Sequence, residues 1–223
     1  MRQLFDDWPE TYDQWFATPI GRLVKKVEGD LLLDLIKPHP GDLILDAGCG
    51  TGVFTLDLLH LGCRIIGTDL SMPMLLRAKQ KAGGYPFRIV LADLLNLPFS
   101  ANSFGKVISV TALEFIEDGR RAIEELFRVT KRRGSLVVAT LNSLGPWALQ
   151  RNAEARQKHT IFEQAIFRSP EELLSLTPIH GEIRTAIHFR KEEYPEIAPG
   201  IEQEGFEKGL NTGAFLAARW VKP

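Results

Sequence analysis

The chain has little cysteine, almost no net charge and no long hydrophobic run, and each shortage argues against a class of protein. Cys49 and Cys63 are its two cysteines in 223 residues, so a disulfide framework is not indicated and we expect two reduced thiols. Its 27 lysines and arginines are matched by 28 acids, which gives no signal of a nucleic-acid surface. No apolar stretch approaches the roughly 20 residues of a membrane span.

The first residues also lack the features of a targeting segment. Residues 1–7 carry two aspartates and no apolar run, unlike a secretory or transit peptide, so we expect a cytoplasmic protein. The five histidines show no helical pairing at three- or four-residue spacing, so we expect no metal site. A single domain is expected, because one hydrophobic core can grow to about 250–300 residues. The oligomeric state cannot be predicted.

Hydrophobic periodicity predicts an α/β protein. Apolar residues from Ile20 to Leu35 recur at helical spacing, and Pro38 ends that helix. Short apolar runs then alternate with longer amphipathic segments, which is typical of a Rossmann-like, doubly wound and mostly parallel sheet with helices on both faces. We expect strands at Leu43–Asp46, Arg64–Thr68, Phe87–Leu91, Lys106–Val110 and Ser135–Thr140, and helices at Val53–Leu61, Met72–Lys81 and Arg120–Thr130. Helical composition over Asn142–Thr177 precedes two late strands, Glu182–Phe189 and Ala214–Val221.

A glycine-rich turn follows the first expected strand in the segment Asp46-Ala47-Gly48-Cys49-Gly50-Thr51-Gly52. Glycines allow a ligand to approach the backbone closely and permit positive φ. A dinucleotide fingerprint starting at Gly48 would need a third glycine at position 53, which is Val53. The Asp46 carboxylate would repel a pyrophosphate but attract a sulfonium or ammonium group. The turn therefore favours a positively charged nucleoside, and a nicotinamide-dependent oxidoreductase is the weaker alternative.

Two further acids follow the next two expected strands. Asp69 comes 21 residues after Gly48, a spacing typical of the acid that binds ribose hydroxyls, although it could instead cap a helix. Asp93 could accept from an adenine amine while Leu94 covers the ring, or could simply be solvated. All three acids are expected at the carboxyl edge of the sheet, where open α/β folds bind ligands.

These segments together resemble the class I methyltransferases of the type 11 group, which includes ubiquinone/menaquinone and biotin-precursor methyltransferases. The resemblance covers about residues 40–142, and residues 129–135 depart from it by lacking a proline and one glycine before the fifth strand. Leu43–Gly52 is similar to the family's first motif, Ile66–Ser71 to its ribose segment, Ala92–Phe99 to its adenine segment and Phe104–Phe115 to its fourth-strand motif. The resemblance implies a seven-stranded sheet with an antiparallel last strand, S-adenosylmethionine (SAM) as cofactor and S-adenosylhomocysteine as product.

The resemblance also implies which residues form the site and how it works. It implies an in-line displacement in which an acceptor atom attacks the sulfonium methyl. The expected cofactor residues are Asp46, Gly48, Cys49, Gly50, Gly52, Asp69, Leu70, Asp93, Leu94 and Thr111. Glu114, His159 and His188 are candidate bases, but for each of them an exposed or structurally bonded polar residue is the preferred interpretation, so no catalytic residue is assigned. A protein that binds the cofactor without turnover remains an alternative, because its cofactor loop would be the same.

The acceptor must be recognised by residues outside the resemblance. We expect three parts of a single domain: an N-terminal helical lid or cap over residues 1–38, a cofactor-binding core over 40–142, and a helical insert with the last strands over 143–223. Aromatic residues gather in the first and third parts, and Tyr12, Trp15 and Phe16 are expected to contact the acceptor or to cover the site with Glu114. A small, partly apolar methyl acceptor is the leading hypothesis; alternatively, the rings complete the core.

Overall fold

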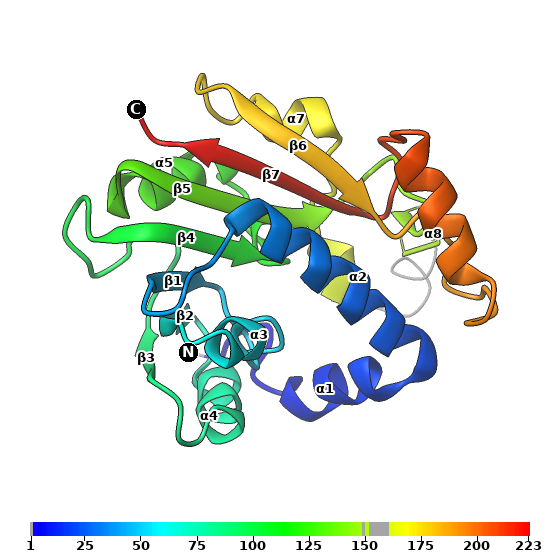
Figure 1. Ribbon diagram of the computed structural model, residues 1–223. Helices are drawn as coiled ribbons and strands as arrows, with labels where there is room; N and C mark the ends of the chain where they lie inside the picture. The colour runs from blue at the N-terminus through cyan, green and yellow to red at the C-terminus, as the bar shows by residue number, and fades with distance from the viewer. Residues whose placement is uncertain (1, 149, 152–160) are drawn as a thin grey trace.

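A computed structural model of the protein describes residues 2–148, 150–151 and 161–223. Its centre is a seven-stranded sheet of order β3-β2-β1-β4-β5-β7-β6 (Figure 1). The described strands run in one direction except β7, which is antiparallel to both of its neighbours, β5 and β6, as predicted. In the part of the chain that the structure describes, no helix has the length and apolar character to cross a membrane. The strands are β1 (Leu43–Ala47), β2 (Arg64–Asp69), β3 (Phe87–Leu91), β4 (Phe104–Val110), β5 (Thr130–Leu141), β6 (Gly181–Ala186) and β7 (Phe215–Val221).

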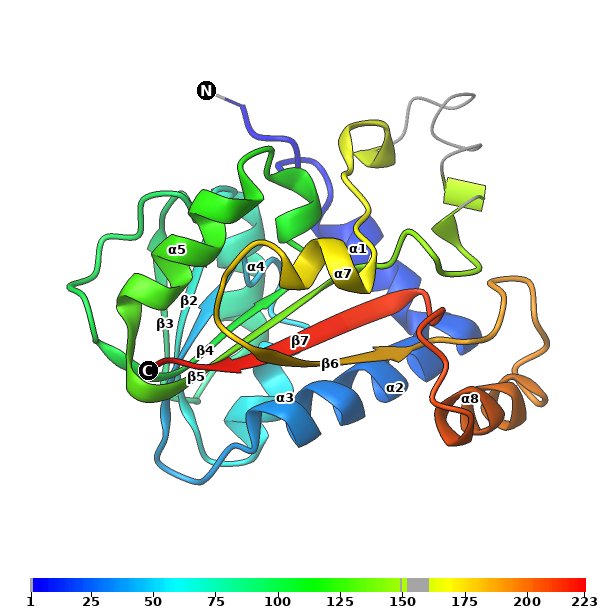
Figure 2. The ribbon, with the colours of Figure 1, turned by 90° about the horizontal axis from the view of Figure 1, so that it is seen from above.

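Helices cover both faces of the sheet (Figure 2). The helices α2, α3 and α8 lie on one face, and α5 and α7 lie on the other. Local capping fixes several of the helix starts: Thr18 caps α2, Ser71 caps α4, and Asp118 caps α5. The helices are α1 (Pro9–Ala17), α2 (Pro19–Ile36), α3 (Thr55–His60), α4 (Met72–Lys81), α5 (Gly119–Val129), α7 (Pro170–Leu174) and α8 (Ala198–Glu207), with 3₁₀ turns η1 (Leu113–Phe115) and η2 (Ile161–Gln164).

The sheet is buried on both faces because successive strand residues point in opposite directions. Ile44 packs with the α2 and α3 side of the core, whereas the next residue, Leu45, packs with the α5 side. Neither residue has any exposed surface. Each fully buried side chain of this kind stabilises the fold by about 1.5–3 kcal/mol, so the two apolar faces hold the carboxyl edge of the sheet rigidly in place.

The element boundaries differ from the predicted ones in two informative places. The strand β5 begins at Thr130, five residues before the predicted start, because the basic run Lys131–Arg133 joins the strand and does not end the preceding helix. The strand β6 ends at Ala186, three residues before the predicted end, and the next residue, Ile187, has a φ of 65° that breaks the extended run. His159, one of the candidate bases, lies outside the described residues.

The N-terminal helices have separate roles. Helix α2 buries Val24, Leu32 and Leu35 against the sheet, so it belongs to the core. Helix α1 precedes it and adds Tyr12 and other partly buried rings to the edge of that core. Only the residues before α2 therefore remain candidates for a lid.

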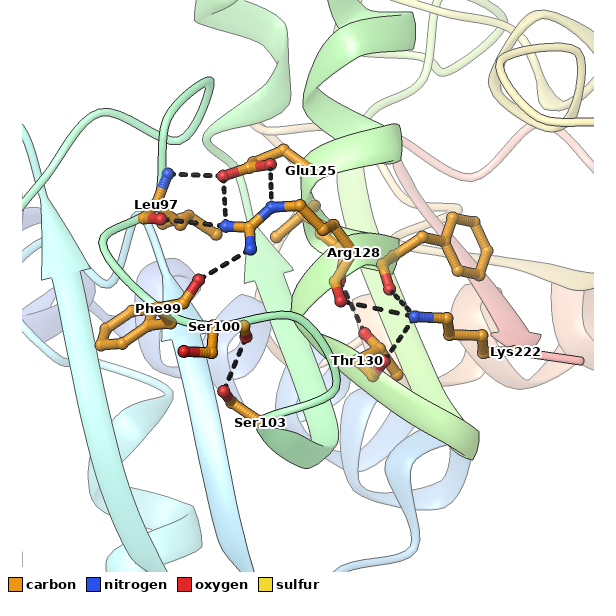
Figure 3. Close-up of polar contacts among 10 residues, drawn as sticks. Leu97, Phe99, Ser100, Ser103, Glu125, Arg128, Thr130 and Lys222 are labelled. Carbon is orange, nitrogen blue, oxygen red and sulfur yellow. Dashed lines mark hydrogen bonds and ion pairs between the residues drawn. The ribbon is translucent and has the colours of Figure 1, made fainter.

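A network of hydrogen bonds and one ion pair holds the loop after β3 in place (Figure 3). Arg128 on α5 donates to the carbonyls of Phe99 at 2.7 Å and Leu97 at 3.0 Å. Glu125 accepts from the Leu97 N–H at 2.7 Å and pairs with the same arginine. One ion pair thus holds the carbonyls of Leu97 and Phe99 and the amide of Leu97, three residues after Leu94 of the carboxyl edge.

Candidate active site

The glycine-rich turn joins β1 to α3 and is held by backbone hydrogen bonds to β2. The N–H groups of Gly48 and Cys49 both donate to the Thr68 carbonyl, at 2.7 and 2.8 Å. The Gly50 N–H donates to Asp69 Oδ2 at 2.9 Å. Gly48 and Gly50 have φ values of 78° and 52°, which side chains other than glycine rarely adopt. The turn thus presents bare backbone at the carboxyl edge of the sheet.

A cavity of about 280 Å³ opens over this turn and is called the cofactor cavity below. It brings together nine of the ten predicted cofactor residues, which lie at or just after the carboxyl ends of the four neighbouring strands β1, β2, β3 and β4. These are Asp46, Gly48, Cys49, Gly50, Asp69, Leu70, Asp93, Leu94 and Thr111. The tenth, Gly52, does not line the cavity: a Cβ atom there would lie 3.1 Å from the Ala78 Cβ, so this glycine allows α4 to pack closely.

The acids of the cofactor cavity differ in their surroundings. Asp46 is 3% exposed, and burial raises its pKa to about 7 although Thr55 Oγ1 donates to it at 2.5 Å. Burial also raises the pKa of Asp69, opposed by backbone N–H groups of Ser71 and Gly50. Asp93 is exposed and accepts from the Leu95 N–H at 2.9 Å. A cationic ligand would stabilise the charged forms of the buried Asp46 and the partly buried Asp69, as expected from the sequence.

A second cavity of about 250 Å³ adjoins the first and is called the aromatic cavity below. Its rings come from α1 and the residues before it, from η1 and from the chain after β5. The two cavities share Phe5, Tyr12, Thr111 and Phe115 in their walls. The ring-bearing residues are Phe5, Trp8, Tyr12, Trp15, Phe16, Phe115, Trp147 and Phe162. Because the two cavities adjoin at these shared residues, two ligands bound in them can lie next to each other.

The structure distributes the predicted acceptor residues between these cavities. Tyr12 lines both, whereas Trp15, Phe16 and Glu114 line only the aromatic cavity. His188 lines neither: it lies against Glu202, with Nδ1 and Oε2 3.2 Å apart, and the interaction with this carboxylate raises its pKa.

Sequence reasoning missed Glu28, Arg151 and Lys191, which also line the aromatic cavity. For Glu28 a signal exists, because it occupies the same face of α2 as the buried residues Val24 and Leu32, four positions to either side. Arg151 and Lys191 carry no comparable pattern, because their positions depend on how the chain after β5 and β6 folds back over the sheet.

The fold and the site define an α/β protein with a mostly parallel sheet and a cavity at the carboxyl edge of that sheet, lined by Asp46, Asp69 and Asp93. The methyltransferase domain family matches residues 45–138. A malonyl-[acyl-carrier protein] O-methyltransferase of Hamiltonella defensa is 32% identical over 209 residues, covering 89% of this chain and 78% of that protein. The chain therefore belongs to the class I SAM-dependent methyltransferases of the type 11 group. It is a SAM-dependent methyltransferase, and the alternative of a nicotinamide-dependent oxidoreductase is wrong.

Other relatives share the fold but differ in what they act on. A demethylmenaquinone methyltransferase of Thermobifida fusca is 34% identical over 119 residues; these cover 52% of this chain and half of that protein's length. A SAM-dependent methyltransferase of Thermotoga maritima, described as a possible histamine N-methyltransferase, matches with a TM-score of 0.69 at 22% identity over 98% of both chains. The geranyl diphosphate C-methyltransferase of Streptomyces coelicolor matches with a TM-score of 0.63 at 19% identity, over 88% of this chain and 78% of that one.

Proposed function

We propose that this enzyme transfers the SAM methyl group, by in-line displacement, to a small, partly apolar acceptor in the aromatic cavity. The common wall of the two cavities, formed by Phe5, Tyr12, Thr111 and Phe115, carries the proposal. Direct transfer requires the reacting atoms to come within about 3–3.5 Å of each other. Two adjoining compartments allow such an approach, whereas two separate sites would not.

The cofactor cavity offers a suitable group for each part of SAM. The bare turn from Gly48 to Gly50 suits the amino-acid part, because a Cβ atom added at Gly50 would meet no other atom within 4 Å. Asp69 retains acceptor capacity for the ribose hydroxyls beyond the two backbone N–H groups that it holds, since a carboxylate can accept about four hydrogen bonds. Asp93 and Leu94 suit the adenine amine and ring.

Bound SAM supplies an electrophilic methyl group on a positively charged sulfur. The chain's own contribution is to orient the acceptor and to exclude water, since apolar surroundings favour dispersal of that charge. Phe5 and Phe115 pack edge to face, with ring centroids 4.8 Å apart, across this part of the site. Much of the catalysis can therefore come from positioning.

The residues before α2 are proposed to act as a lid, with residues 40–142 as the cofactor core and 143–223 as the insert and last strands. The motive is that α1 borders both cavities through Tyr12. A chain beginning at Thr18 tests the lid, because it removes α1 but keeps the residue that caps α2. We expect cooperative unfolding, weaker SAM binding and, in the full-length protein, protection of Trp15 from proteolysis only with SAM. Failure to fold, or protection without SAM, would make the segment structural.

The proposed function is tested in two steps. Titration calorimetry with SAM, S-adenosylhomocysteine and NAD should give binding of the first two only. A methyl-transfer screen over metabolite pools with labelled SAM should then yield a labelled small molecule. Cofactor binding without any labelled product from small molecules would refute the proposed acceptor class.

A further inference from the structure

The aromatic cavity contains two acids that the cofactor site does not use. Glu28 enters it from α2 and Glu114 from η1, both among aromatic rings. They are 8% and 1% exposed, respectively. A carboxylate in apolar surroundings is strongly destabilised unless a cation or hydrogen-bond donors compensate it. Two such groups in one apolar cavity therefore point to the chemistry of what binds there.

Glu114 lies next in sequence to Phe115 of the wall shared by the two cavities and has unused hydrogen-bonding capacity. Its Oε2 accepts from Thr140 Oγ1 at 3.0 Å, while its buried Oε1 has no hydrogen-bond partner among the described residues. Burial raises its pKa to about 7, and the positive charges of Arg151 and Arg168 offset this only partly. Near neutral pH this carboxyl can both bind and release a proton.

Glu28 has the same character. No hydrogen bond to its carboxyl group is found in the described part of the chain, and burial raises its pKa to about 8. The charge of Arg151 opposes that shift, whereas the charges of Glu114 and Glu202 add to it. A bound cation would replace the solvation that this carboxylate has lost.

The two acids lie near the boundary with the cofactor cavity. Both raise the pKa of the Tyr12 phenol, after the larger effect of burial, and Tyr12 borders both cavities. Arg151 and Lys191 also line the cavity, and the charge of Arg151 lowers the pKa values of both acids without reversing the effect of burial. The Arg151 guanidinium lies 5.0 Å from the centroid of the Trp147 ring and 5.1 Å from that of Phe162. On the side of the cavity near Tyr12, an acceptor's reacting atom would face the two carboxyl groups and aromatic rings.

We infer that the acceptor is an amine on an aromatic or apolar framework, bound as its ammonium ion between the rings and the pair Glu28 and Glu114, and methylated on nitrogen. This inference rests on the proposed function. Ammonium ions are attracted both to ring faces and to buried carboxylates. A carboxylate acceptor, in contrast, would have to enter against two acids, and a neutral alkene would leave them uncompensated.

The transfer balances with the groups present. The ammonium ion gives one proton to the Glu114 carboxylate, which frees the nitrogen lone pair. That pair forms the N–C bond as the C–S bond breaks, and the C–S electrons remain on sulfur. The products are S-adenosylhomocysteine and an N-methylammonium ion, and Glu114 later loses the proton to water. The positive charge that leaves sulfur thus reappears on a nitrogen between two acids.

Matched compounds that differ only in their functional group test the inference. Three frameworks are each offered as amine, alcohol and carboxylate: 2-phenylethylamine, 2-phenylethanol and phenylacetate; tryptamine, tryptophol and indole-3-acetate; hexylamine, hexanol and hexanoate. Binding to the protein saturated with S-adenosylhomocysteine is measured by calorimetry. We expect the amine to bind about tenfold or more tightly than its alcohol in at least one framework, with the carboxylate weakest. An alcohol or carboxylate that binds as tightly as its amine in all three frameworks would overturn the inference.

Substitution separates the acids from the rest of the cavity. Glu28→Gln and Glu114→Gln keep side-chain volume but cannot ionise, so each should abolish most of the amine preference while leaving S-adenosylhomocysteine affinity unchanged. Glu124→Gln, on the exposed face of α5, is the matched control and should change neither. Variants that fold and still prefer amines would refute the role of these acids. If the unmodified protein does not bind S-adenosylhomocysteine, the proposed function itself is refuted.

Discussion

The Asp13 carboxylate on α1 accepts a hydrogen bond from Thr51 Oγ1 in the glycine-rich turn, with the two oxygens 2.7 Å apart. The same carboxylate pairs with Arg77 at 2.8 Å and Lys81 at 2.7 Å, both on α4. Burial raises the pKa of Asp13, but the hydrogen bonds from Lys81, Arg77 and Thr51 together lower it by a larger amount, so the pKa lies below its ordinary value. One carboxylate therefore ties the N-terminal helix to the turn beneath the cofactor cavity.

Asp13→Ala should loosen α1. Loss of charged hydrogen bonds should destabilise the protein by about 1–3 kcal/mol and weaken SAM binding. Thermal unfolding and calorimetry measure the two effects, and hydrogen exchange of residues 9–17 should become faster. Gln14→Ala, the next residue on the same helix and exposed, is the control. Unchanged exchange in the Asp13 variant would show that ring packing alone holds α1.

Asp69→Ala should weaken SAM binding by about 10- to 150-fold, since a charged hydrogen bond contributes about 1.5–3 kcal/mol. Part of the loss comes through the turn, because Asp69 also accepts from the Gly50 N–H. Glu124→Ala is the appropriate control. Asp57, although on the helix after the turn, forms an ion pair with Lys25 and is unsuitable. Equal affinities in the two variants would remove Asp69 from the site.

Gly50→Val should abolish SAM binding in a folded protein. Gly84→Val provides a matched control, because both glycines have positive φ, 52° and 86°, and at neither would a Cβ atom meet another atom within 4 Å. Both variants should lose a similar stability, about 1–2 kcal/mol per strained residue. Only Gly50 lines the cofactor cavity. Normal SAM binding by the Gly50 variant in calorimetry would refute the assignment of the turn.

Glu28→Gln should change how stability depends on pH. Burial raises the pKa of Glu28 from 4.5 to about 8, so the folded state holds this proton more tightly than the unfolded state. The free energy of unfolding of the ligand-free protein therefore falls as pH rises from about 4.5 to 8. The Gln variant cannot ionise at this position, so its free energy of unfolding lacks this pH dependence.

Thermal unfolding at pH 5 and pH 8.5 tests this prediction. The Gln variant should gain stability relative to the unmodified protein at the higher pH only. Asp46 and Glu114, whose pKa values burial also raises, give the unmodified protein a slope of the same sign. An equal difference between variant and unmodified protein at both pH values would contradict the prediction.

The cofactor half of the molecule could be predicted from sequence because its signals are local. Asp46, Asp69 and Asp93 each lie at or just after the carboxyl end of a strand, and parallel strands bring these ends to one edge without further information. The predicted antiparallel last strand came from the family resemblance and is confirmed. The motif alone could not show that Gly52 lies outside the cofactor cavity, because a glycine in the turn can be required for close helix packing instead.

The acceptor half could not be predicted in the same way. Glu28, Trp147 and Lys191 meet only because α2 and the segments after β5 and β6 converge in three dimensions. No spacing in the sequence predicts that these three residues line one cavity. Aromatic composition indicated which segments matter, but an aromatic residue in a core and one in a cavity have the same pattern.

Helix α1 and the residues before it contribute to the walls of both cavities, through Tyr12 and Phe5. A ligand that restricts the motion of this shared wall would lower the conformational entropy that a second ligand loses on binding. The two binding equilibria would then be cooperative. By thermodynamic linkage, the factor by which SAM tightens acceptor binding must equal the factor by which the acceptor tightens SAM binding.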